Sequence, residues 1–285
     1  MHRLALAFLV ALVAATLSVS LSAAAPTQSQ RYHRIISLSP TVTEDLFRIG
    51  TGPQVIAVDQ DSNYPASAPQ TSLSGYSPNV EAISAYHPDL VFISYNPNGF
   101  AAQLRKLGIK VVMEPAAVDL AQAYDEITGI GRLTGHQTTA ASVVRFMKRR
   151  MAEIVASVPP IRRHLRVYHE LDQTYYSVTS NTFIGSIYKL FGFKNIADPA
   201  GASAGTDYPQ LSGEYIVQSN PNIVVLADTR CCGQSQSTVA ARPGWNTIAA
   251  VVHNRVVGVN DDIASRWGPR IVRFAYVVAR IAKRH

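Results

Sequence analysis

The chain has 285 residues, of which 47% are hydrophobic and 16% charged. This length and composition suffice for two packed domains and exclude a disordered chain. The formal net charge is +7, and such a basic chain would suggest a nucleic acid partner if it stayed in the cytoplasm.

Residues 1–25 are predicted to be a secretory signal peptide. Arg3 supplies a positive start, residues 4–17 are apolar apart from Thr16, and small residues at 22–25 offer a cleavage site. An uncleaved anchor is the less favoured alternative, because the apolar run is shorter than the ~20 residues of a spanning helix. No cysteine lies nearby for lipid attachment. We expect an exported protein of the periplasm or cell envelope, not a lipoprotein, with residues 26–33 as a leader tail.

Residues 34–137 are predicted to form an N-terminal lobe of the α/β class. Strand-like segments alternate with helical stretches and lie at 34–38, 55–58, 90–94 and 110–113. The core of the third segment, Leu90–Ile93, is apolar without alternation. Such runs are typical of parallel strands that are covered on both faces.

Residues 138–160 are predicted to form a long helix that bridges two lobes. Val143, Met147 and Met151 follow helical spacing, and Pro159-Pro160 closes the segment. Basic side chains gather in and after this helix: Arg145, Lys148, Arg149, Arg150, Arg162, Arg163 and Arg166. Because export is expected, a solvated helix face near anionic lipid headgroups is favoured over a nucleic acid site.

Residues 161–285 are predicted to form a C-terminal lobe that repeats the alternation. Its expected strands lie at 165–170, 175–178, 223–227 and 256–259, and a basic amphipathic helix follows from about residue 269. We therefore expect two Rossmann-like lobes with mostly parallel sheets.

One segment occurs twice, which supports the two-lobe organisation. Glu81 to Ile93 returns as Glu214 to Leu226, and the glutamates and prolines are both offset by 133 positions. Each copy has the pattern of a short helix, a proline and a buried strand. A chance match of a common connector is the alternative.

Several separated motifs resemble periplasmic solute-binding proteins of the cobalamin and siderophore type, which serve ABC importers. The motifs occur in the family's order and cover nearly all of the chain after the leader: residues 34–46, 63–65, 75–81, 88–91, 106–109, 240–245 and 266–270. The resemblance implies two lobes joined by one long helix, with the solute held between them. It also implies a stiff hinge.

Ligands of open α/β sheets bind at the loops that follow the strands. We therefore expect the solute to contact these loops. Four of these loops carry tyrosines, whose flat faces and hydroxyl edges suit a large macrocycle. The ligand-binding residues expected from these loops and from the family motifs are Tyr64, Tyr76, Tyr95, Tyr208, Arg230, Trp245, Arg266 and Trp267. Arg242 and Arg270 join Arg230 and Arg266 as candidates to meet anionic groups, which would shift the ligand toward a ferric siderophore.

Glu81 and Glu214 are the expected docking residues for a permease. In relatives, a glutamate on each lobe meets arginines of the membrane protein, and the repeat places this pair at equivalent positions of the two lobes. The alternative is a purely structural role, because an acid in the first turn of a helix is stabilised by the helix dipole.

Cys231 and Cys232 are the only cysteines, and they are adjacent. A disulfide between them that shapes a loop at the cleft rim is the favoured hypothesis in an oxidising compartment. Free thiols, or a thiolate that meets a metal-containing ligand, are the alternatives.

No pair of histidines falls at a zinc spacing, so no metal site of the protein's own is predicted. His169 is a candidate cleft residue and haem ligand, although a structural role is favoured. No catalytic motif fits, so we expect no enzyme and no cofactor of its own. The hypothesis is a monomeric receptor that carries a cobalt or iron chelate, corrinoid before ferric siderophore, to a permease with its ATPase. A haem carrier, or a secreted sensor or scaffold without a transport role, is the alternative.

Overall fold

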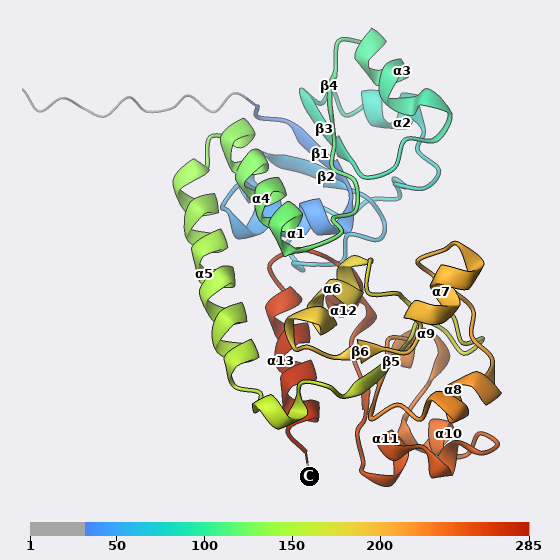
Figure 1. The fold of residues 1–285 in the computed structure, drawn as a ribbon. Helices are drawn as coiled ribbons and strands as arrows, with labels where there is room; N and C mark the ends of the chain where they lie inside the picture. Colours follow the sequence, from blue (N-terminus) through green and yellow to red (C-terminus); the bar gives the residue numbers. More distant parts are fainter. Residues whose placement is uncertain (1–31, 285) are drawn as a thin grey trace, which may run out of the picture.

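The computed structural model describes residues 32–284, and the predicted leader lies outside this range. The chain forms two α/β lobes, each built on a four-stranded parallel sheet (Figure 1). The strand orders are β2-β1-β3-β4 and β6-β5-β7-β8, so the two sheets have the same topology. No helix of the described part of the chain is long and apolar enough to cross a membrane.

The N-terminal lobe has all four strands where the sequence predicts them: β1 (Ile35–Leu38), β2 (Val55–Val58), β3 (Leu90–Ile93) and β4 (Lys110–Met113). Its helices are α1 (Pro40–Arg48), α2 (Val80–Ser84), α3 (Phe100–Lys106) and α4 (Leu120–Thr134). Helix α1 begins where Ser39 accepts the Val42 N–H and Pro40 occupies the first turn. This short connection places the start of α1 directly beyond β1.

The C-terminal lobe contains strands β5 (Arg166–Glu170), β6 (Lys194–Asn195), β7 (Ile223–Leu226) and β8 (Val256–Gly258). Its longer helices are α6 (Phe183–Leu190), α7 (Asp198–Ala204), α8 (Gly213–Ser219) and α13 (Ile271–Ala282). Its short helices are α9 (Thr229–Cys232), α10 (Gln236–Ala240), α11 (Ala249–Val252) and α12 (Asp261–Ser265).

One predicted strand of this lobe is wrong. Residues 175–178 form no sheet strand; they run antiparallel beside the loop at 207–211, with a single bridge between Tyr176 and Gln210. The sheet position is taken instead by the two-residue β6. The segment therefore pairs with this loop instead of joining the sheet.

Helix α5 (Gln137–Ala156) is the predicted bridge, and it runs along the side of both lobes (Figure 1). It packs against α4 of the first lobe and α13 of the second. One hydrophobic cluster runs from β1 and β3 through α4 and α5 to β7 and α13. The opposite faces of the two sheets have separate cores, under α2 and α3 in one lobe and under α8 and α10 in the other. The shared cluster joins the lobes into one packed body.

The internal repeat corresponds to equivalent local structure in the two lobes. His87 and Asn220 both adopt the left-handed backbone region, with φ of 49° and 44°. The carbonyl of each accepts a hydrogen bond from an arginine at the start of the lobe's first strand, Arg34 in one lobe and Arg166 in the other. Two hydrogen-bonded corners of this kind, at matched positions, favour duplication over chance.

Candidate ligand-binding cleft

One wall of a cleft between the lobes consists of residues that follow strands of the N-terminal sheet. Ser39 follows β1, Asp59 follows β2, and Ser94 and Tyr95 follow β3. The Ser94 hydroxyl donates to the Ser39 Oγ across 2.7 Å, which ties two of these loops together. The cleft therefore lies at the carboxyl ends of the strands, where open α/β sheets bind ligands.

The other wall comes from helix α12 and the residues after it, which lie beyond β8 of the C-terminal lobe. Asn260 caps α12 by accepting the Ile263 N–H, and this turn directs Asp261 and Asp262 to the cleft. The two walls enclose about 390 Å³. That volume lies in the range of roughly 300–1,000 Å³ that is typical of small-molecule sites.

Four of the expected ligand-binding residues meet in this cleft: Tyr76, Tyr95, Arg266 and Trp267. The side chain of Tyr76 is 75% exposed and that of Tyr95 is 54% exposed. Two large rings on the wall of one hollow offer flat apolar faces to a ligand.

Three other expected residues lie outside the lining of this cleft. The Tyr64 ring lies 4.1 Å from the Arg270 guanidinium and faces a neighbouring hollow of about 290 Å³ beside Phe146. Tyr208 is half-exposed in the loop between α7 and α8. Its partial burial, and next the negative charge of Asp207, raise its pKa. Arg230 lies at the cleft rim, 3.7 Å from Asp262.

Trp245 is not available to a ligand, contrary to expectation. Its side chain is only 1% exposed, because it packs edge-on against Tyr168 and stacks on Tyr175. The Arg242 guanidinium lies over its ring at 4.5 Å. The family-like motif around Trp245 thus supports the core of the second lobe.

The arginines expected to meet anionic ligand groups are mostly engaged within the protein. Arg266 donates to Glu44 and to Asp262, both at 2.9 Å, and Arg270 donates to the same Glu44 at 2.7 Å. Glu44 belongs to the first lobe and the two arginines to the second. We call Glu44, Arg266 and Arg270 the interlobe cluster. It holds the lobes together and leaves little positive charge free for a ligand.

Trp267 adds a second polar contact between the lobes. Its indole N–H donates to Glu126 of α4 across 2.7 Å. Burial raises the pKa of Glu126 to about 8, and it raises the pKa of the nearby Asp45 well above its usual value, with Glu126 as the next cause. Neither oxygen of Asp45 has a hydrogen-bond partner. Protonation of this acidic pair removes most of the cost of burying it.

A further set of acids in the cleft was missed by sequence reasoning. Asp59 and Asp61 line it from the first lobe, and Asp261 and Asp262 from the second. Burial raises the pKa of Asp59 to about 6 and also raises that of Asp261. Asp59 and Asp61 directly follow β2, and Asp261 and Asp262 follow β8 closely. An acid placed after a strand is the signal that would have found them.

His169 is structural and does not face the cleft. It is fully buried between Tyr188 and Phe274, and its Nδ1 lies 2.7 Å from the Tyr188 hydroxyl. Burial lowers its pKa to about 3. It is therefore out of reach of a haem iron, and within residues 32–284 no group of three His, Cys, Asp or Glu side chains could hold a metal.

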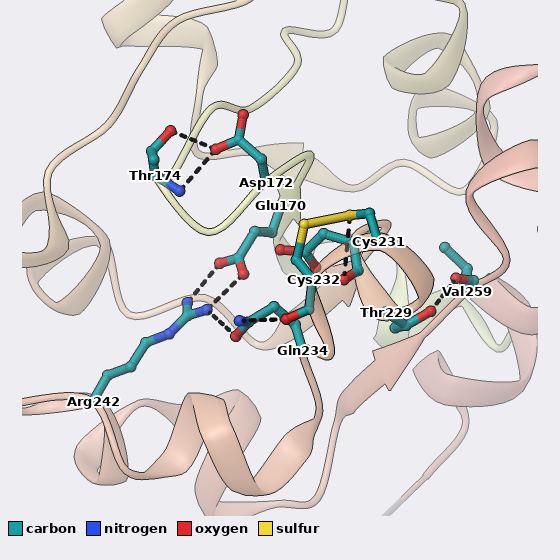
Figure 2. Close-up of a disulfide and its surroundings, with 10 residues drawn as sticks. Glu170, Asp172, Thr174, Thr229, Cys231, Cys232, Gln234, Arg242 and Val259 are labelled. Carbon is teal, nitrogen blue, oxygen red and sulfur yellow. Dashed lines mark hydrogen bonds and ion pairs between the residues drawn. A yellow bond between two sulfur atoms is a disulfide. The ribbon is translucent and has the colours of Figure 1, made fainter.

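Arg242 is held by the neighbouring Glu170, which is fully buried in β5. The guanidinium forms a fork on the two carboxylate oxygens, each at 2.6 Å, and also reaches the Gln234 side chain at 2.8 Å (Figure 2). The expectation that Arg242 meets an anionic ligand is therefore not met.

Cys231 and Cys232 form a disulfide in helix α9, just beyond β7 (Figure 2). The Cys232 N–H donates to the Asp228 carbonyl, and the Gln234 side-chain amide donates to the Cys232 carbonyl. The neighbouring Arg230 reaches Asp262 in the cleft wall. The disulfide thus lies between Arg230, which contacts the cleft wall, and Gln234, which contacts Arg242.

The two expected docking glutamates occupy matching places. Glu81 is in the first turn of α2, capped by Asn79, and Glu214 is in the first turn of α8, capped by Ser212. Both side chains are exposed, and neither forms an ion pair within the described residues. Each carboxylate is stabilised by its helix N-terminus and remains open to a partner.

The chain belongs to the periplasmic binding protein family, whose model matches residues 35–263. The chain is therefore a binding protein and not an enzyme. The prediction of this family from the sequence motifs is therefore confirmed.

Two curated relatives illustrate the similarity. The cobalamin-binding protein of Halobacterium salinarum is 33% identical over 247 residues, covering 84% of this chain and 66% of the relative, just under two thirds of its length. The vitamin B12-binding protein of Yersinia pestis is 29% identical over 250 residues, covering 86% and 84%. Among solved structures, a possible iron-binding solute-binding protein from Staphylococcus epidermidis matches with a TM-score of 0.76 and 27% identity, covering 89% of this chain and all of that one.

Proposed function

We propose that this protein captures a corrinoid, a cobalt-centred macrocycle, in the cleft between its lobes and delivers it to the permease of an ABC importer. The observation that carries the proposal is the pair of exposed rings, Tyr76 and Tyr95, on one wall of the cleft. Planar macrocycles are held by such faces, and two relatives are named for binding cobalamin. Tyr208 and Tyr64 are the further aromatic residues that we assign to this ligand.

A ferric chelate is the second candidate, because the chain also resembles a possible iron-binding protein. Arg266 and Arg270 already bind Glu44 within the protein. This argues against a ferric siderophore, since anionic siderophores need free positive charge. Corrinoid binding is therefore preferred.

Calorimetric titration tests the proposal. The purified protein is titrated with cyanocobalamin, cobinamide, haem and several ferric siderophores. We expect binding of one corrinoid per chain and weaker binding of the iron compounds. Tighter binding of a ferric siderophore would assign the cleft to iron uptake, and failure of every ligand would favour a sensor or scaffold.

Delivery requires a docking surface, for which we propose Glu81 and Glu214. Their matched, exposed positions on the two lobes suit the two related halves of a permease. We further propose that the protein is exported with its leader removed, acts as a monomer, and needs no cofactor of its own.

A further inference from the structure

The cleft is rich in acid although the whole chain is basic. Among the residues that line it, Asp59, Asp61, Asp261 and Asp262 carry carboxylates, and Arg266 is the one basic side chain. The net charge of +7 would suggest an affinity for anions. The local composition of the cleft indicates the opposite preference.

The positive charge of Arg266 is already neutralised. Arg266 is 9% exposed and is shared between Glu44 and Asp262, each at 2.9 Å. Glu44 also holds Arg270, and Arg230 at the rim lies 3.7 Å from Asp262. Three arginines thus face two acids, and none of these arginines forms an ion pair with Asp59, Asp61 or Asp261.

Asp59 is a buried acid of the cleft that no basic side chain pairs with directly. It lines the cleft, is only 2% exposed, and its Oδ1 has no hydrogen-bond partner. A buried carboxylate oxygen without a partner is costly, and a cation or a hydrogen-bond donor from a ligand would remove that cost. Burial raises its pKa only to about 6, so the group is mostly ionised at neutral pH.

We infer that the cleft selects metal chelates of net positive charge and discriminates against polyanionic ones. Carboxylates from both lobes, Asp59 and Asp61 on one side and Asp261 on the other, supply the attraction. This inference rests on the proposed function, because it names the class of corrinoid that the same cleft prefers. It adds a preference between corrinoids of different charge, which the proposed function does not make.

Two forms of one ligand test the inference without a change of shape. Aquacobalamin carries a net positive charge, whereas cyanocobalamin is neutral and differs only in the axial ligand of cobalt. We expect the purified protein to bind aquacobalamin roughly tenfold more tightly at low salt. The preference should shrink as salt is raised, because the charges lie at a solvent-connected cleft.

Asp59→Asn, Asp61→Asn and Asp261→Asn variants should each reduce the preference for aquacobalamin. Asp61 and Asp261 are only half-buried, so these two variants test the inference even if Asp59→Asn unfolds. Asp125→Asn, on the exposed face of α4 and away from the cleft, is the matched control and should keep the preference.

The outcomes distinguish failure of the charge preference from failure of corrinoid binding. Equal affinity for the two cobalamins, or a preference that all three cleft variants retain, overturns the charge inference while the corrinoid function stands. Tighter binding of an anionic ferric siderophore than of either cobalamin overturns both. Absence of any cobalamin binding rejects the proposed function and the inference with it.

Discussion

Arg266 of the C-terminal lobe donates a 2.9 Å hydrogen bond to Glu44 of the N-terminal lobe, and both side chains are at least nine-tenths buried. Arg270 shares the same carboxylate. This ion pair and the shared hydrophobic cluster along α5 oppose bending of the lobes about the bridging helix. We therefore expect a stiff hinge, from these contacts as well as from the single helical link.

The first prediction concerns the loss of Glu44. Glu44→Ala would leave two largely buried guanidinium groups without their shared acid, so we expect a loss of about 3–5 kcal/mol in the free energy of unfolding. Urea denaturation measures it. Glu153→Ala on α5 is the matched control, because that glutamate pairs with the exposed Arg149 and Arg150. Its loss should cost no more than about 1 kcal/mol. Equal effects of the two substitutions would contradict the account.

The second prediction concerns pH and Glu126. Burial raises the pKa of Glu126 from 4.5 to about 8, so the folded protein holds a proton that the unfolded chain releases between these values. The stability that comes from this group is complete below pH 4.5 and is lost as the pH rises through about 8.

Glu126→Gln keeps an acceptor for the Trp267 indole but cannot ionise. We therefore expect its melting temperature to fall less than that of the wild type between about pH 5 and about pH 9. Thermal unfolding across that range measures the difference, with Glu153→Gln as a surface control. Parallel curves for wild type and Glu126→Gln would show that Glu126 titrates normally.

The third prediction concerns the tyrosines. Tyr76→Ala and Tyr95→Ala should each weaken cyanocobalamin binding by about 2- to 13-fold, the range expected for the loss of one aromatic stacking contact. Tyr276→Ala is the matched control, because Tyr276 is 55% exposed on α13 and lies outside the cleft lining. A Tyr208→Ala variant, measured alongside, tests whether that loop contributes. Unchanged affinity in the Tyr76 and Tyr95 variants would remove these rings from the site.

The fourth prediction concerns docking. Glu81→Ala combined with Glu214→Ala should leave ligand affinity unchanged and weaken binding to the cognate transporter reconstituted in lipid. The control removes the same charge elsewhere, through Asp125→Ala and Glu153→Ala on exposed faces of α4 and α5. If the two double variants support uptake equally well, the glutamates serve only their own helices.

The fifth prediction concerns the disulfide. Alkylation without reductant, followed by mass spectrometry, should label neither Cys231 nor Cys232, and both should be labelled after reduction. Cys231 is exposed at the surface, so mild reductant should suffice. Two labelled cysteines before reduction would exclude the disulfide.

The lobes and their strands were predictable because buried parallel strands leave apolar runs, as at Leu90–Ile93 and Ile223–Leu226. The strand predicted at 175–178 is wrong because these residues pair with the loop at 207–211, which is distant in sequence, and not with the sheet. Strand β6 could not be predicted, since two residues carry no periodicity.

The candidate site was only partly predictable for a related reason. Tyr76 and Tyr95 could be predicted because they lie in loops at the ends of the sheet. In the sequence, Trp245 and Arg266 look equally available to a ligand. The structure shows that aromatic rings enclose Trp245 and that acids surround Arg266. Asp59 and Asp261 are about two hundred positions apart and meet only because the lobes face each other. Each acid could be found from its place after a strand, but only the tertiary structure shows that the acids of the two lobes line one cleft.

The most direct test is a crystal structure of the protein with cyanocobalamin. We expect the corrin ring between the lobes, in contact with Tyr76, Tyr95 and the segment that contains Arg266 and Trp267. A corrin bound elsewhere, or a cleft that stays empty at saturating ligand, would contradict it.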